Sequence, residues 1–304
     1  MDVTALADGV RQRQVRDLAR AISLVEDSSP QVPALLAALA GPHHARVLGI
    51  TGSPGVGKST TTSALVRILR ERGQTVAVLA VDPSSPFSGG ALLGDRVRMQ
   101  EHATDPGVYI RSMASRGHLG GLAAATIQAL HVLDAAGFDV VVLETVGVGQ
   151  SEVEVAGAAD TTVVLLAPGM GDGIQAAKAG ILEIGDVICV NKADRDGAQA
   201  TARELRAMVA LGARVPGAWT PEVVLSVAAQ PDGIDDLVTA IDAHEAWLTE
   251  HGQSRLLERA RQEVLAWTVG MLQSRIDVAR LEAAAARVAA GEIDAPSAAR
   301  ALLE

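Results

Sequence analysis

The stretch GITGSPGVGKSTTTSALVRIL, residues 49–69, decides how the chain around it folds. Residues 52–59 match the phosphate-loop pattern G-x-x-x-x-G-K-[ST] at every fixed position. The apolar run before the loop, residues 46–50, predicts a buried strand, and residues 59–70 predict a helix with one apolar face. In this context converging backbone N–H groups and the helix N-terminus attract phosphate, so a glycine-rich turn that carries Lys-Ser by chance is a poor alternative. We expect a nucleotide-binding protein.

The loop also predicts individual roles. Lys58 is expected to reach the β- and γ-phosphates, and the Ser59 hydroxyl is expected to ligate Mg2+. The full set of nucleotide-contacting residues expected from this segment is Gly52, Ser53, Pro54, Gly55, Val56, Gly57, Lys58, Ser59 and Thr60.

Composition excludes several classes of partner. The 304 residues are 48% hydrophobic and 20% charged, which is enough for a full core. A net charge of −10 and an aromatic content of 2% argue against nucleic acid and anionic membrane surfaces. The single cysteine, Cys189, lies in an apolar run and is expected to be an inert core residue. Without a signal-peptide core or an apolar run of 18 residues, we expect a cytoplasmic protein.

Apolar strands alternate with helices from Arg46 to about Leu248, a pattern typical of a parallel sheet covered on both faces. We therefore predict an α/β fold in which a phosphate-loop domain, residues 45–250, lies between helical arms at 1–44 and 251–304. The predicted strands are Val47–Thr51, Val76–Val81, Val108–Arg111, Val140–Glu144, Thr162–Ala167, Val187–Val190 and Val223–Ser226.

Both arms show helical spacing. In the first arm the pattern runs from Leu6 to Ile22, and a break at residues 27–30 precedes a short helix from Val32 to Ala40. In the second arm, apolar residues from Leu257 to Met271 step by three and four, and Pro296 is expected to cap a final helix, Ser297–Leu303. This seam packs either on the chain's own domain or on a second copy, and we favour the dimer.

Acidic residues follow two of the predicted strands. Asp82 ends the second strand, and Asp95 closes the Pro- and Gly-rich loop after it; both are expected to approach Mg2+ or its waters, or to act as an Asx turn and a helix N-cap. Glu144 ends the fourth strand and is followed by Gly147, whose N–H is expected to face the γ-phosphate. The position where many small GTPases carry a water-orienting Gln is Val148, and Gln150 lies further on, so we predict slow intrinsic hydrolysis.

Two later segments complete the predicted site. The loop from Asp172 to Lys178 opens a helix; Asp172 is either an N-cap or part of a second loop that senses the nucleotide. Asn191, Lys192 and Asp194 follow a strand. The carboxylate of Asp194 can accept both the N1–H and the exocyclic amine of guanine, which predicts selection of GTP. The backbone of Ser226, Val227 and Ala228 is expected to meet the guanine carbonyl oxygen.

Taken together these motifs resemble the methylmalonyl-CoA mutase-associated GTPases of the MeaB/ArgK type. The resemblance is carried by GSPGVGKST at 52–60, DPSSPFSGGALLGDRVRM at 82–99, ETVGVGQSE at 144–152, PGMGDGIQAAKAGILEIGD at 168–186 and NKAD at 191–194. It covers about residues 45 to 250 closely, and ETVGVGQSE discriminates best from ordinary small GTPases.

The resemblance implies a homodimeric GTPase that acts as a chaperone for an adenosylcobalamin-dependent acyl-CoA mutase. It implies that the mutase stimulates hydrolysis, that GTP gates cofactor loading, and that adenosylcobalamin is held by the partner. It also implies that Asp82, Asp95 and Glu144 organise Mg2+, and that the Gln150 region and the Asp172–Lys178 loop are switches. Rival interpretations are a GTP-dependent kinase of a transport protein, a metal-insertion GTPase, and a scaffold that binds GTP only for stability.

Overall fold

The computed structural model describes residues 2–42, 45–83, 100–115, 121–145, 157–169, 181–212, 217–230, 232–251 and 275–303, with short stretches between 260 and 272. The chain forms two compact units, Met1–Leu257 and Glu258–Glu304. The larger unit contains the sheet and the predicted site. The limits expected at residues 44 and 250 stay predictions.

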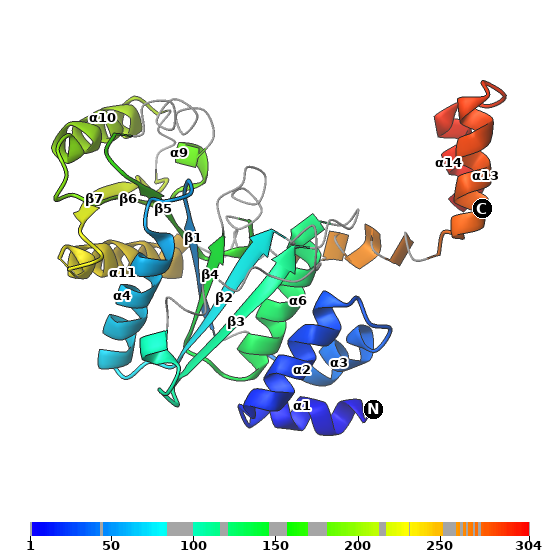
Figure 1. The fold of residues 1–304 in the computed structure, drawn as a ribbon, viewed down its shortest axis with the longest axis horizontal. Helices are drawn as coiled ribbons and strands as arrows, with labels where there is room; N and C mark the ends of the chain where they lie inside the picture. Colours follow the sequence, from blue (N-terminus) through cyan, green and yellow to red (C-terminus); the bar gives the residue numbers. More distant parts are fainter. Residues whose placement is uncertain are drawn as a thin grey trace. The chain divides into compact units, whose positions relative to one another are not determined.

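Seven parallel strands form one sheet in the order β3-β2-β4-β1-β5-β6-β7 (Figure 1). Their bounds are β1 Arg46–Thr51, β2 Val76–Pro83, β3 Val108–Ser115, β4 Val140–Thr145, β5 Thr161–Leu166, β6 Val187–Asn191 and β7 Glu222–Ser226. All seven predicted strands are confirmed, and so is the α/β fold class. Residues of β4, β5 and β6 are buried throughout, because helices cover both faces of a parallel sheet.

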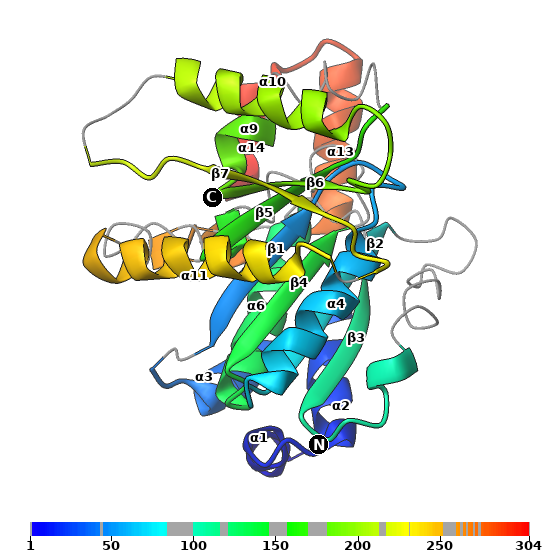
Figure 2. The ribbon, with the colours of Figure 1, turned by 90° about the vertical axis from the view of Figure 1, so that its left-hand side faces the viewer.

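The helices divide between the two faces. α4 (Lys58–Glu71) and α11 (Ile234–His251) share one hydrophobic core with the strands, and α10 (Ala198–Leu211) builds a second core on β5 and β6. α6 (Gly121–Ala135) contacts β4, and the short α9 (Ile181–Ile184) contacts β5. Figure 2 shows β6 and β7 passing between α10 and α11. A 3-10 turn, η1 (Gln100–His102), precedes β3.

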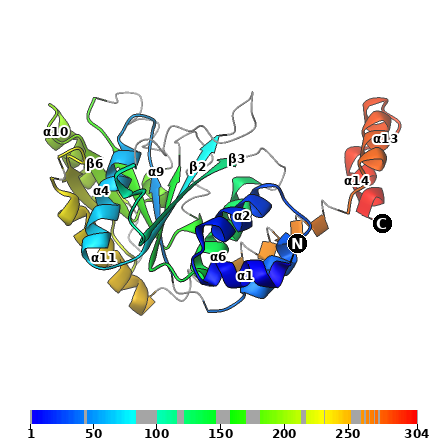
Figure 3. The same cartoon turned by 60° about the horizontal axis from the view of Figure 1, so that its bottom comes forward.

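The N-terminal arm consists of α1 (Val3–Arg11), α2 (Val15–Glu26) and α3 (Val32–Leu39), which pack against α6 (Figure 3). The expectation of a continuous helical pattern to Ile22 was wrong, because the chain breaks at residues 12–14. Arg13 has a left-handed φ of 56° there. Its guanidinium lies 4.8 Å from the centroid of Phe138 and donates to the carbonyl of Ala136 at 2.9 Å, so a distant contact fixes the break.

The smaller unit contains α13 (Val278–Ala289) and α14 (Ala295–Leu303). The predicted cap at Pro296 was wrong by two residues: Asp294 accepts from Ser297 N at 2.9 Å and from its hydroxyl at 2.7 Å, so the helix starts at Ala295 and Pro296 lies in its first turn. These hydrogen bonds also lower the pKa of Asp294. Val278 and Leu281 are exposed on α13.

Candidate nucleotide-binding site

The phosphate loop runs from the end of β1 to the start of α4, at the carboxyl edge of the sheet where ligands of such folds bind. Two of its glycines are required by close contacts. Gly52 has φ +141°, and a Cβ there would lie 2.2 Å from the carbonyl oxygen of Leu165 on β5. Gly57 has φ +100°, and a Cβ there would lie 2.3 Å from Nδ2 of Asn191. The backbone of the phosphate loop therefore lies in close contact with β5 at Gly52 and with the end of β6 at Gly57.

Lys58 begins α4 and is buried at 7% exposure. Its ammonium donates to the carbonyl oxygens of Gly52 at 2.7 Å and Ser53 at 3.1 Å. These contacts hold the Lys58 ammonium against the backbone of the phosphate loop. The predicted phosphate-binding cation therefore lies at the N-terminus of α4.

Ser59 and Glu144 come together from different elements. The Ser59 hydroxyl, in the first turn of α4, donates to Oε1 of Glu144 at 2.6 Å, and both residues are buried. The parallel register explains the meeting, since Ile50 of β1 pairs with Glu144 of β4 directly beside the loop. A hydroxyl and a carboxylate are the hard oxygen donors that suit Mg2+, so the two residues fit the predicted metal role.

Asn191 connects two loops. Its Nδ2 donates to the carbonyl of Val56 at 2.8 Å, and its Oδ1 accepts from Ala228 N at 3.0 Å and from the Ser226 hydroxyl at 3.3 Å. The side chain is 3% exposed. It therefore fixes the distance between the phosphate loop and the segment 226–228.

Lys192 and Asp194 lie beyond that brace. Lys192 has a left-handed φ of 57°, and its ammonium donates to the carbonyl of Gly55 at 2.5 Å, so its stem runs along the phosphate loop. Asp194 is exposed. The Asp194 carboxylate is therefore accessible to a ligand that enters from solvent.

Cys189 belongs to this arrangement, which sequence reasoning missed by assigning it only to the core. Its Sγ lies 3.1 Å from the Ser226 hydroxyl, which itself reaches Asn191. The signal was present, because Cys189 is two residues before Asn191 and alternation along a strand puts both side chains on one face. Complete burial raises the pKa of the Cys189 thiol to about 12, so it is uncharged and unreactive at neutral pH.

Several predicted residues lie outside the described part of the chain. These are Asp95, Gly147, Gln150, Asp172 and Lys178. Asp82 is described by its backbone, which sits near the end of β2 two positions beyond Ala80, the register partner of Glu144. The roles predicted for all of them stay predictions.

Comparison with known proteins decides the family. The family model described as "Methylmalonyl Co-A mutase-associated GTPase MeaB" matches residues 18–285. The chain belongs to the MeaB family of GTPases. It is 43% identical to a candidate GTPase of Pyrococcus abyssi, over 99% of this chain and 96% of that one. It is 40% identical to the GTPase ArgK of Escherichia coli, over 85% of this chain and 80% of that one.

A solved structure supports the fold of this MeaB-family GTPase. The crystal structure of a LAO/AO transport system kinase superposes with a TM-score of 0.70 at 29% identity, covering 99% of this chain and 96% of that one. The family assignment confirms the resemblance seen in the sequence motifs. Among the described residues, no helix combines the length and apolar character needed to cross a bilayer.

Proposed function

We propose that this MeaB-family GTPase hydrolyses GTP as a chaperone of an adenosylcobalamin-dependent acyl-CoA mutase, and we name methylmalonyl-CoA mutase as that partner. The family match over residues 18–285 carries the proposal, because the family is described by its association with that mutase. In this proposal GTP turnover gates loading of the cofactor, and adenosylcobalamin is held by the mutase.

The site supplies the groups that such turnover requires. Lys58 neutralises the β- and γ-phosphates, and the backbone between Gly52 and Gly57 donates to them. Asp194 accepts from guanine, while Asn191 keeps the guanine-binding and phosphate-binding loops at a fixed distance.

Ser59 and Glu144 are the described residues that would hold Mg2+, with Asp82 and Asp95 as further proposed ligands of the ion or its waters. When bound, Mg2+ offsets the negative charge on the phosphate oxygens. Ser59 would then turn its oxygen to the ion, and Glu144 would orient the surrounding waters. Val148 stands where small GTPases carry a water-orienting Gln, so we propose that turnover is slow until the partner accelerates it.

The decisive measurement is GTP hydrolysis by the purified protein, alone and with adenosylcobalamin-dependent methylmalonyl-CoA mutase, with ATP as the control nucleotide. We expect slow GTP turnover that rises severalfold with the mutase, and none with ATP. GTP turnover that does not change when this mutase is added would overturn the choice of partner but would leave the assignment as a GTPase intact. Equal use of ATP would contradict the role of Asp194.

A kinase of a transport protein is the second candidate, because the similar crystal structure, at a TM-score of 0.70, is that of a LAO/AO transport system kinase. Such a kinase would transfer the labelled γ-phosphate of GTP to a protein acceptor. Label on a protein, after incubation with a cell fraction that contains transport proteins, would favour the kinase. Release of all the label as inorganic phosphate would favour the GTPase.

A further inference from the structure

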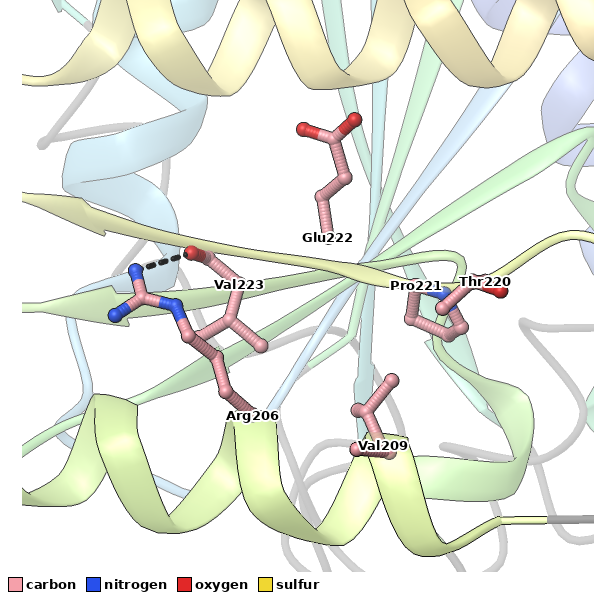
Figure 4. A pocket seen from close by; sticks show the side chains of 7 residues that line it. Arg206, Val209, Thr220, Pro221, Glu222 and Val223 are labelled. Carbon is pink, nitrogen blue, oxygen red and sulfur yellow. Dashed lines mark hydrogen bonds between the residues drawn. The ribbon is translucent and has the colours of Figure 1, made fainter.

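The two edges of the sheet differ in what covers them. β3 forms one edge, and its Arg111 donates to Ser23 at 2.9 Å and to Glu26 at 2.6 Å, both on α2. β7 forms the other edge. A pocket of about 330 Å³ lies beside β7, between α10 and the segment leading into the strand (Figure 4).

Alternate residues of β7 direct their main-chain groups outward. The carbonyl of Ser226 accepts from Ala193 N at 3.0 Å, which places it on the β6 side. The carbonyl of Val223 points the opposite way and accepts from Arg206 Nη2 of α10 at 2.8 Å. Since direction alternates along a parallel strand, Leu225 faces outward together with Val223.

Both outward carbonyls are already covered. Arg206 donates to the carbonyl oxygen of Val223. Gly233 lies so close to the carbonyl oxygen of Leu225 that a Cβ on Gly233 would be 2.2 Å from it. Gly233 therefore covers the edge at Leu225, and the edge at the pocket presents the outward N–H group of Val223 and the Arg206 guanidinium, which has five N–H groups and uses one in this bond. An added β-strand must donate as well as accept, so this edge suits a ligand that only accepts.

The walls of the pocket add an apolar surface. Val209 on α10 points toward Pro221, whereas the Glu222 carboxylate lies on the α11 side of the strand (Figure 4). Leu211, at the end of α10, is 85% exposed. Arg206, Thr220 and Glu222 are also exposed, so the pocket is open to solvent, and such a surface fits a macromolecule better than a small ligand.

We propose that the α10–β7 edge, defined by Arg206, Val209, Pro221 and Val223, binds an acidic, apolar segment of a protein partner. A carboxylate of the segment pairs with Arg206, because carboxylates only accept and match the guanidinium fork. A neighbouring apolar side chain packs on Val209 and Pro221. The edge lies at the start of β7, and the nucleotide site lies at its end, so the two can be occupied together. The proposal does not depend on the identity of the mutase.

The test uses the full chain and a fluorescein-labelled hexapeptide of alternating leucine and aspartate, with the leucine–asparagine peptide as the neutral control. We expect fluorescence anisotropy to show binding of the acidic peptide and about tenfold weaker binding of the neutral one. Arg206→Gln should weaken the acidic peptide about tenfold, while Arg203→Gln, an exposed arginine on the same helix, should not.

Three results would overturn the proposal: no binding of the acidic peptide, equal binding of the two peptides, or an Arg206→Gln variant that binds like the unchanged protein. GTP turnover provides the check on folding, since Arg206 is outside the nucleotide site and its replacement should leave turnover unchanged. A protein that hydrolyses GTP normally but has lost peptide binding locates the defect at this edge.

Discussion

Asn191 donates from Nδ2 to the carbonyl of Val56 at 2.8 Å, and this bond ties the end of β6 to the phosphate loop. The Oδ1 atom of Asn191 accepts from Ala228 N at 3.0 Å. Since the side chain is buried, water cannot replace these partners, and one residue fixes the spacing of two loops that a guanine nucleotide would bridge.

Replacing Asn191 with Ala should therefore weaken GDP binding by about tenfold or more, because two buried groups lose partners at a cost of about 1–3 kcal/mol each. A fluorescent GDP titration measures the change. Ser226→Ala removes the 3.3 Å contact to Asn191 and the 3.1 Å contact to Cys189 but keeps the two shorter bonds of Asn191, so it should have a smaller effect. Equal affinities in all three proteins would show that the brace does not set the nucleotide site.

The Ser59–Glu144 contact predicts how catalysis depends on Mg2+. Glu144→Gln keeps the size of the side chain but removes its charge, so GDP should still bind. GTP turnover should fall by about two orders of magnitude, as when a preorganised polar group is lost from such a site, and more Mg2+ should be needed for half-maximal rate. Single-turnover hydrolysis over a Mg2+ series measures both. An unchanged rate and an unchanged Mg2+ requirement would exclude Glu144 from the metal site.

Cys189 gives a prediction about pH. Burial raises the pKa of its thiol to about 12 from an ordinary value of 9.0, so the folded protein keeps it neutral while the unfolded chain ionises above pH 9. The associated stability is present below pH 9 and is lost as the pH rises toward 12. At pH 8 a disulfide reagent should label Cys189 slowly in the folded protein and rapidly in denaturant. Rapid labelling of the folded protein would contradict the burial.

The strands could be predicted from the sequence because a parallel sheet covered on both faces needs continuous apolar runs, and Val140–Leu143 is such a run. The break at Arg13 could not. The helical spacing of apolar residues continues across the break, from Val10 to Val15. The carbonyl that Arg13 contacts belongs to Ala136, which lies 123 residues away in the sequence. A local pattern carries no information about a contact of that range.

The candidate site shows the same division. Motif order placed Lys58, Ser59, Glu144 and Asn191 at one edge of the sheet, because the carboxyl ends of parallel strands meet there. The contact of Lys192 with Gly55 was beyond sequence reasoning, since it depends on a left-handed φ of 57° that Lys rarely adopts. The donor-only edge at Val223 was also hidden, because Arg206 carries no motif and acts through a main-chain carbonyl.

Asp194 should set the choice of base. In the proposed site its carboxylate would accept from two N–H groups of guanine, and Asp194→Asn replaces one acceptor with a donor. GDP should bind at least about tenfold more weakly, because hydrogen bonds to a charged group contribute about 1.5–3 kcal/mol. XDP, which carries a carbonyl where guanine has its exocyclic amine, should gain affinity. Competition of GDP, XDP and ADP against a fluorescent nucleotide measures the preference, and an unchanged GDP preference would contradict this role.

Gly57 and Gly55 offer a matched pair for testing the loop geometry. Both have positive φ, +100° and +80°, so replacement with Ala strains the backbone at either position. A Cβ at Gly57 would lie 2.3 Å from Asn191 Nδ2, whereas a Cβ at Gly55 would meet nothing within 4 Å. Gly57→Ala should therefore abolish GDP binding by displacing Asn191, and Gly55→Ala should cost only the strain, about 1–2 kcal/mol or roughly tenfold in affinity. Isothermal titration with GDP compares the two variants. If both lost the same affinity, strain alone would account for the requirement for glycine, and the contact with Asn191 would not decide it.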